Sequence, residues 1–227
     1  MIESLKSYQG KMANTVRAFV LKINEVSDKD DECVPDGYDD FRKIFKGFMD
    51  ICENIETIDM LYILVGINPP RSRLVSVDLY LKHLISSYLS EVYILKERLN
   101  SYATKISRMY AKVDPTLDVK DDFEQLYASI KESLEGINNT RNLHVHSERH
   151  SDEDLDWLSS LKLVSDTDNS FKDSFDYQYK KSRIKWKKKI SDNNEVMVKL
   201  LTNYFDVIFK IISVDGDIVL PNKPVVQ

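Results

Sequence analysis

The sequence predicts an all-α protein, a bundle of about six helices of which two are long. Apolar residues recur every three or four positions through most of the chain, which is the period of a helix face. Only six glycines and six prolines occur in 227 residues, too few for a turn-rich β architecture. The 42% hydrophobic content is enough to bury a sizeable core, and no segment is convincing as a strand.

Two helices are predicted before residue 70. The first has one apolar face, made of Leu5, Met12, Val16, Phe19, Ile23 and Val26. The turn-forming residues 34–37 indicate a loop, in which Asp36 is placed to cap the next helix. That second helix has its apolar face at Phe41, Ile44, Phe48, Ile51, Ile55, Ile58, Leu61 and Val65. The Asn68-Pro69-Pro70 sequence should stop it.

The third and fourth helices follow. Spacings of four and three continue over residues 77–109, so a rod of roughly 50 Å is expected, ending near Asp114-Pro115. The fourth helix should open at Asp118, with Phe123, Leu126, Ile130, Leu134 and Ile137 on its inner face. Poor helix formers at Gly136 and at residues 138–140 favour a kink or restart.

In the last third of the chain, the pattern predicts shorter helical segments. Residues 151–154 resemble an N-cap, followed by a short helix with Leu155, Leu158 and Leu161 inside and a polar loop at 165–170. A further segment carries Tyr179, Trp186 and Ile190 on one face, where Trp186 is expected in the core. A capped restart is expected at 192–195, and then a long last helix with Met197, Leu200, Tyr204, Val207, Ile208 and Ile211 inside, ending at Asp215-Gly216-Asp217.

We expect one all-helical domain over residues 1–220, followed by a loose tail at 221–227. The two cysteines, Cys33 and Cys52, match no metal spacing, and the start of the chain is unlike a secretory leader, which predicts reduced thiols and a cytoplasmic location. The longest apolar run, residues 58–67, is too short to span a bilayer, so no membrane association is expected.

Charge is unevenly distributed. The chain carries a net charge of −5, but residues 180–190 hold seven positive charges and no acid, which leaves −12 for the remainder. Overall acidity argues against a protein that coats nucleic acid, whereas one basic patch is compatible with salt-sensitive contact with a polyanion. The candidate phosphate-binding residues are Lys180, Lys181, Arg183, Lys185, Lys187, Lys188 and Lys189.

Residues 141–146 bring a cation, an amide and imidazoles into two helical turns. Arg141 is permanently charged and can donate two hydrogen bonds to a phosphate, and His146 can take or give a proton near neutral pH. Arg141 follows Ile137 by four residues, so it falls on the buried stripe of the helix. Because an unpaired buried charge is costly, Arg141 should face a partner, a groove or an interface. Asn142 and His146 lie on the adjacent row.

The sequence Arg141-Asn142-x-x-x-His146 resembles the R-N-x(3)-H form of the R-x(4–6)-H signature of the HEPN superfamily, helical domains of toxins, abortive-infection proteins and CRISPR-associated effectors. Residues 74–213 agree more loosely with the family bundle, and residues 1–70 would be an N-terminal helical extension. The resemblance implies a metal-independent endoribonuclease without cofactor, acting as a homodimer whose two motifs meet. It makes Arg141 and His146 the catalytic pair, with Asn142 orienting the histidine or the phosphate. RNA is then the substrate, and a toxin–antitoxin or phage-defence role, with an antitoxin protein as partner, would follow.

Other interpretations stay open. Many family members have lost activity, so a catalytically inactive HEPN module that binds nucleotide, RNA or a protein is the alternative, and a purely structural scaffold is a third. Arg141 could form a structural salt bridge, and the lysines could be a solvated face. His144, which could also support a phosphate, forms with His146 and His150 a spacing that suggests zinc, although no cysteine or paired carboxylate completes a ligand set.

Overall fold

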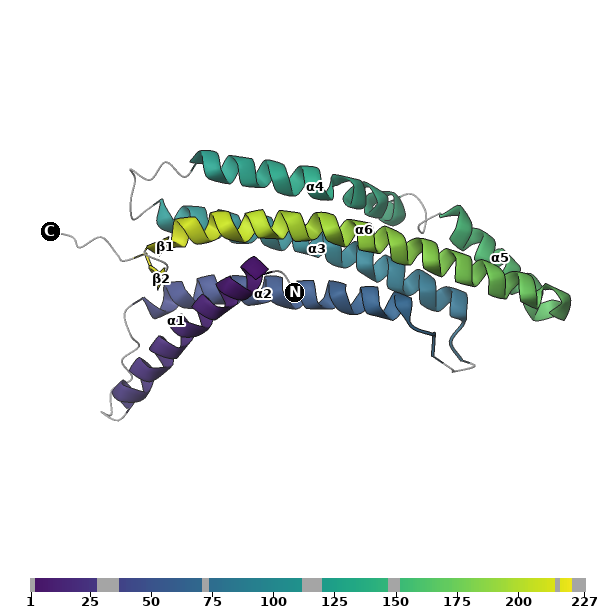
Figure 1. Ribbon diagram of the computed structural model, residues 1–227, viewed down its shortest axis with the longest axis horizontal. Coiled ribbons are helices and arrows are strands. Elements are labelled where there is room, and N and C mark those ends of the chain that lie inside the picture. Colours follow the sequence, from purple (N-terminus) through teal and green to yellow (C-terminus); the bar gives the residue numbers. More distant parts are fainter. Residues whose placement is uncertain are drawn as a thin grey trace. The chain divides into compact units, whose positions relative to one another are not determined.

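The structure, a computed structural model, describes residues 3–27, 37–70, 74–111, 120–146, 152–214 and 217–221. Within these residues it has six α-helices (Figure 1), which confirms the all-α bundle. They are α1 (Glu3–Ser27), α2 (Tyr38–Gly66), α3 (Val77–Tyr110), α4 (Lys120–His146), α5 (Glu153–Thr167) and α6 (Lys172–Ile212). The predicted boundary residues Asp36, Asp114 and Asp118 lie outside the described residues.

The two long helices are α3, with 34 residues, and α6, with 41. The predicted restart at residues 192–195 is wrong, because α6 passes through it without a break. Ile190 and Met197, on either side, are both buried, so one apolar face continues across the polar stretch. The Tyr88 hydroxyl donates to Oδ1 of Asn194 at 3.2 Å, which holds this polar residue against α3. Packing therefore outweighs the local capping signal.

The predicted polar loop at residues 165–170 is also wrong. Helix α5 continues to Thr167, and a 3₁₀ turn, η1 (Asn169–Phe171), leads directly into α6. The Ser165 and Thr167 hydroxyls donate to the Lys162 and Val164 carbonyls, both at 2.9 Å. These polar side chains thus provide hydrogen bonds to carbonyl groups at the end of the helix, where the sequence predicted a loop. The predicted N-cap of α5 is confirmed, since Asp152 accepts from the Asp154 amide at 3.1 Å.

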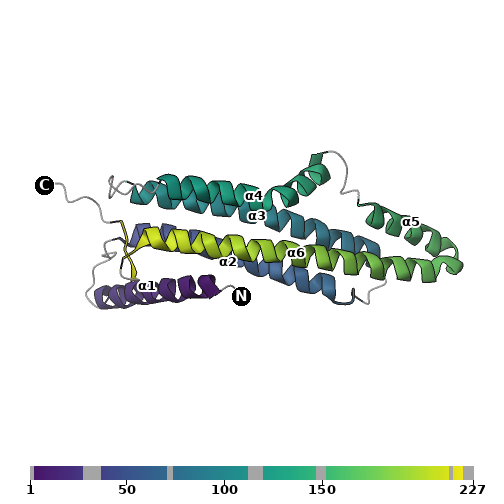
Figure 2. The ribbon, with the colours of Figure 1, turned by 45° about the horizontal axis from the view of Figure 1, so that its top comes forward.

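A short antiparallel ribbon, absent from the prediction, follows α6. Strands β1 (Ser213–Val214) and β2 (Asp217–Ile218) pair Ser213 with Ile218, and β2 packs against α1 (Figure 2). The Tyr110 hydroxyl donates to the Val219 carbonyl at 2.6 Å, which ties the ribbon to the end of α3.

The described contacts divide the chain into two compact units, each assembled from separate segments. We call Met1–Cys52, Glu97–Glu132 and Met197–Gln227 the aromatic unit, and Glu53–Lys96 with Ser133–Val196 the basic unit. Helices α2, α3, α4 and α6 each contribute one part to either unit. Residues from both sides of position 70 occur in both units, and one domain with an N-terminal extension to residue 70 stays a prediction.

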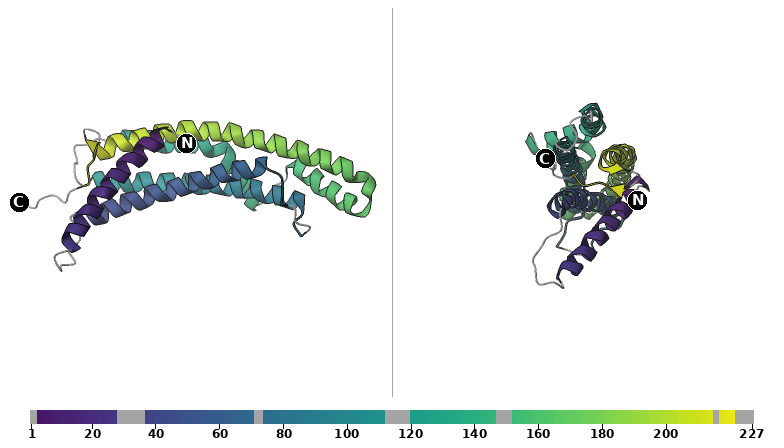
Figure 3. Two further views of the ribbon diagram at one scale, coloured as in Figure 1. Left: turned by 60° about the horizontal axis from the view of Figure 1, so that its bottom comes forward. Right: turned by 90° about the vertical axis from the view of Figure 1, so that its left-hand side faces the viewer.

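The aromatic unit is built around stacked and edge-packed rings. Tyr8 of α1 lies 4.8 Å from the Phe48 ring and 5.2 Å from the Phe205 ring, measured between centroids. Helix α1 thus packs against α2 and the C-terminal part of α6 (Figure 3). The Tyr8 and Tyr102 hydroxyls share a buried hydrogen bond of 2.7 Å, and the Tyr204 hydroxyl donates to the Leu99 carbonyl at 2.8 Å. Burial raises the pKa of Tyr8 and Tyr204 well above the ordinary tyrosine value.

The basic unit is held by leucines and by polar cross-links. Helix α5 lies along the first part of α6 (Figure 1) and buries Leu155, Leu158 and Leu161. On α6, Trp186 and Ile190 are buried, so the predicted core position of the tryptophan is confirmed. Ser159 of α5 donates to Asp78 of α3 at 3.0 Å, which links the two helices.

Candidate functional site

The motif lies at the C-terminal end of α4. This helix runs unbroken from Lys120 to His146, so the predicted kink or restart at residues 136–140 does not interrupt it. The Thr140 hydroxyl donates to the Gly136 carbonyl at 3.0 Å, a bond that lets a poor helix former continue the helix. The backbone of residues 141–146 is therefore helical, whereas the side chains of Arg141, Asn142, His144 and His146 lie outside what the structure describes.

Helical register determines which motif positions are neighbours. At about 100° per residue, positions 141 and 146 are roughly 140° apart around the axis and about 7.5 Å apart along it. Asn142 and His146 are one turn apart on one row, as the sequence predicted. Arg141 shares its row with His144 instead, three positions on. One copy of α4 thus has two pairs of neighbouring positions, 142 with 146 and 141 with 144.

Arg141 continues the apolar stripe of α4. Leu134 and Ile137 are both buried, and position 141 follows them at the seven- and four-residue spacing of the same row. A guanidinium on this row needs a phosphate, a carboxylate or water beside it, because an unpaired buried charge is costly. That Arg141 faces a groove or an interface stays a prediction.

Metal-ligand clusters were searched among the described residues only, and that search found no group of three or more His, Cys, Asp or Glu. Of the zinc spacing, His150 and the side chains of His144 and His146 are not described, so that alternative stays open. The described helices include none that is long and apolar enough to cross a bilayer.

The basic stretch lies on α6 in the same compact unit as the motif, and one side of it is paired with the start of α5. Lys185 forms an ion pair with Asp154, and the Lys189 ammonium lies 3.1 Å from Oδ2 of Asp152. The hydrogen bond from Lys185 holds the pKa of the Asp154 carboxyl below its ordinary value. The same bond raises the pKa of the Lys185 ammonium.

A second side of the basic stretch faces the end of α2. Arg183 donates to the Ile67 carbonyl at 3.4 Å and to Oδ1 of Asn68 at 3.3 Å. The Lys187 ammonium lies 5.6 Å from the centre of the Tyr62 ring, a cation–π contact. Four of the seven predicted phosphate-binding residues are thus already engaged by protein groups.

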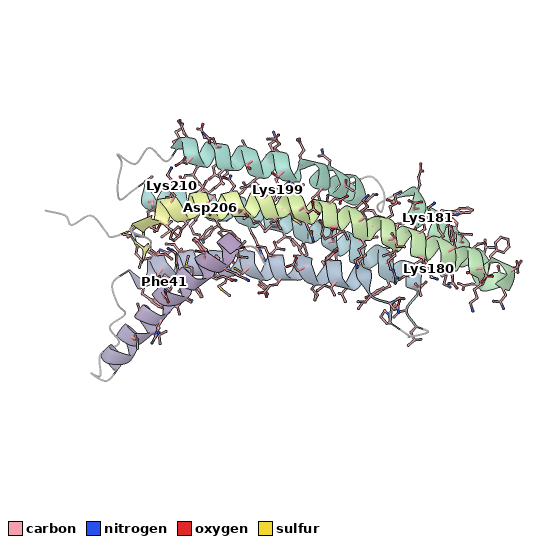
Figure 4. All side chains as sticks on the ribbon, in the orientation of Figure 1. Phe41, Lys180, Lys181, Lys199, Asp206 and Lys210 are labelled. Atoms are coloured by element: carbon pink, nitrogen blue, oxygen red, sulfur yellow. The ribbon has the colours of Figure 1, made fainter. Side chains whose placement is uncertain are left out.

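The remaining three, Lys180, Lys181 and Lys188, are exposed, and no ion pair to them is found within the part of the chain that the structure describes. Figure 4 labels Lys180 and Lys181 on α6. The sequence did not predict which groups bind the other four basic residues. These groups are Asp152, Asp154, Tyr62 and Asn68. The two aspartates were identified as helix-capping residues, and no sequence signal pairs them with lysines some thirty positions away.

Comparisons with protein-family models, with curated proteins and with solved structures found no match in any of the three.

Proposed function

We propose that the chain is a metal-independent endoribonuclease of the HEPN type that acts as a homodimer. The observation that carries the proposal is the R-N-x(3)-H sequence at the end of a long, unbroken helix in an all-α chain. The helical register supports it further, because Asn142 lies one turn from His146 and can orient the imidazole. Arg141 and His146 are the proposed catalytic residues, and His144, which shares a row with Arg141, would contact the same phosphate.

The proposed chemistry uses the nucleophile that RNA carries. One His146 accepts the proton of the ribose 2′-hydroxyl, and the 2′-oxygen attacks the adjacent phosphorus. The bond to the 5′-oxygen breaks, and a second imidazole donates a proton to that leaving oxygen. Arg141 stabilises the negative charge that develops on the phosphoryl oxygens. The products are a 2′,3′-cyclic phosphate and a 5′-hydroxyl end, and no cofactor is consumed.

Two features favour a dimer for this chemistry. A single imidazole cannot comfortably act as base and acid in one turnover, whereas a two-fold axis brings two copies of His146 together. The angular separation of positions 141 and 146 also favours a composite site, since two copies of α4 can direct an arginine row and a histidine row at one phosphate from different sides.

The test is cleavage of a labelled single-stranded RNA with purified protein. We expect His146→Ala and Arg141→Ala to lower the rate by at least about a hundredfold, as loss of an acid–base group does. Products should carry 2′,3′-cyclic phosphate ends, and a chelator should leave the rate unchanged. The matched control is His83→Ala, which removes an exposed histidine of α3. If His146→Ala cleaves as fast as the unmodified chain, the nuclease assignment is wrong.

The alternative is a catalytically inactive HEPN module that binds RNA, a nucleotide or a protein. The engagement of four basic residues within the chain favours it, because fewer cations are left for a long RNA track. A toxin in a toxin–antitoxin or phage-defence system should slow growth on expression, and His146→Ala should relieve this. Growth arrest that persists with His146→Ala would support the binding module.

A further inference from the structure

The basic residues of α6 fall into three rows around the helix. With Trp186 taken as the centre of the buried face, Lys185 and Lys189 lie on the flank beside α5, whereas Arg183 and Lys187 lie on the flank beside α2. Lys181 and Lys188 lie on the side opposite Trp186, and Lys180 lies between that side and the α2 flank, about 120° from Trp186. The two flanks are bound to protein groups. Among the described residues no ion pair engages Lys180, Lys181 or Lys188, although the charge of Lys181 helps to lower the pKa of Asp154, so this third row is the one open to another molecule.

Two large side chains lie on this same outer side. Tyr177 is 69% exposed and Ile184 is 67% exposed, and both are among the exposed large hydrophobic residues of the chain. At about 100° per residue, Tyr177, Lys181, Ile184 and Lys188 form one line along α6. We call this line, with Lys180 beside it, the outer ridge.

The composition of the outer ridge matches a polyanion that has flat, stackable groups. An exposed aromatic ring among lysines is the arrangement that proteins use to bind single-stranded nucleic acid: the ring stacks on a base and the ammonium groups contact phosphates. From Tyr177 to Lys188 the ridge is about 16 Å long, which allows contact with only a few nucleotides. Asp173 and Glu195 lie on the same side of α6 before and after it, so the positive charge ends at both ends of the ridge.

We propose that the outer ridge binds single-stranded RNA, with one base stacked on Tyr177 and phosphates held by Lys180, Lys181 and Lys188. This identification of RNA as the ligand rests on the proposed function, while the binding itself does not require cleavage. Ile184 packs against the sugar or base edge between the lysines. The ridge belongs to the same compact unit as residues 141–146. The proposal reduces the seven candidate phosphate-binding residues of α6 to three.

The experiment measures binding of a fluorescent single-stranded RNA by anisotropy across a series of salt concentrations, with His146→Ala in every protein to prevent cleavage. Each phosphate contact on a single strand contributes about −0.7 to the slope of log affinity against log salt. Lys180→Gln with Lys181→Gln and Lys188→Gln should therefore reduce the slope by about 2. Tyr177→Ala should weaken binding by roughly tenfold at fixed salt, and Tyr177→Phe should restore it, because the phenyl ring still stacks.

The matched control substitutes three exposed lysines of the aromatic unit, Lys105, Lys131 and Lys199, with glutamine. It removes the same charge, so it should leave most of the salt slope intact. If the ridge variant binds RNA like the unmodified chain, or if the control loses as much affinity, the proposal is wrong. Binding of the ridge to vesicles containing anionic lipid, with RNA affinity unchanged by the ridge substitutions, would also overturn it.

Two assays separate this proposal from the nuclease. If ridge substitutions weaken RNA binding but His146→Ala cleaves normally, the proposal of RNA binding by the ridge is supported and the HEPN nuclease proposal is wrong. If His146→Ala stops cleavage but ridge substitutions leave RNA binding unchanged, the nuclease proposal is supported and the proposal of RNA binding by the ridge is wrong. Every substituted side chain of the ridge is exposed, so circular dichroism should show unchanged thermal unfolding.

Discussion

The two compact units use their side chains differently. The aromatic unit buries tyrosine and phenylalanine rings whose hydroxyls bond to one another or to helix carbonyls. The basic unit buries leucines instead, and ion pairs and a cation–π contact near its surface add further links between its helices. Buried rings set a rigid framework that tolerates little change, whereas exposed charges can be exchanged for an outside partner. The residues proposed for RNA cleavage and RNA binding all belong to the basic unit.

Helix α2 shows this contrast at two glycines. A Cβ added at Gly47 would lie 2.5 Å from the buried Tyr102 ring, and one added at Gly66 would lie 2.7 Å from the Lys187 ammonium. The ring cannot move without disturbing the core, but the end of a lysine side chain can rotate into water. Glycine is therefore needed for close packing at position 47 and is replaceable at position 66.

The largest stability effect should come from the ring cluster of the aromatic unit. Phe205→Ala removes a fully buried ring that contacts Tyr8, Phe48 and Tyr204, so the free energy of unfolding should fall by about 3–5 kcal/mol. Phe171→Ala, at a 40% exposed phenylalanine before α6, is the matched control and should cost less than about 1 kcal/mol. Urea denaturation measures both, and equal losses would contradict the contrast between the units.

The next largest effect on stability is expected from substitution of the two glycines of α2. Gly47→Ala should lower the free energy of unfolding by about 1–3 kcal/mol, because the buried Tyr102 ring must shift. Gly66→Ala should change it by less than about 1 kcal/mol, since Lys187 can move and alanine is the better helix former. A Gly66→Ala variant as unstable as Gly47→Ala would show that the basic unit is packed as rigidly as the aromatic unit.

The Tyr8–Tyr102 hydrogen bond should have a comparable but non-additive effect. Tyr8→Phe or Tyr102→Phe alone leaves one buried hydroxyl without its partner, which should cost about 1–3 kcal/mol. The double variant should lose clearly less than the sum, because both hydroxyls are gone. A double-mutant cycle by urea denaturation measures this coupling, and strict additivity would show that the bond contributes nothing.

The smallest effect is expected at the ion pair between α5 and α6. Asp154→Asn should lower the melting temperature by about 1–3 °C at neutral pH, as an exposed pair contributes little. The pKa of Asp154 is lowered in the folded chain, so its contribution is present at neutral pH and is lost as the carboxyl protonates. The difference from the unmodified chain should start to shrink as the pH falls through the ordinary aspartate pKa of about 3.9, and it should vanish only below the lowered pKa of the folded chain. A difference that persists there would point to a cause other than charge.

Much of the fold could be predicted from the sequence. Because each helix buries one face, the 4-3 spacing over residues 77–109 closely matches α3, although this helix ends at Tyr110, before the expected end near Asp114-Pro115. The errors arose where local polar signals met long-range packing. Asp192-Asn193-Asn194-Glu195 reads as a cap, but Tyr88, more than a hundred positions earlier, holds Asn194 in the helix.

The candidate site could be predicted only in part. Residue types at positions 141–146 indicate phosphate chemistry, and the unbroken α4 makes Asn142 a neighbour of His146. The spacing did not show that Lys185 and Lys189 would pair with Asp154 and Asp152, because these contacts depend on how α5 folds back along α6. Periodicity placed Tyr179 on the buried face with Trp186 and Ile190, but it assigned no role to the exposed Tyr177 two positions before it.

The central claim is that one active site needs His146 from two subunits, and mixing the unmodified chain with His146→Ala tests it. After equal amounts exchange subunits, about one quarter of dimers have two intact copies. We predict an RNA cleavage rate near one quarter of that of the same total amount of unmodified protein. A rate of one half would contradict the shared site, and a His146→Ala protein that cleaves at the full rate would contradict the nuclease itself.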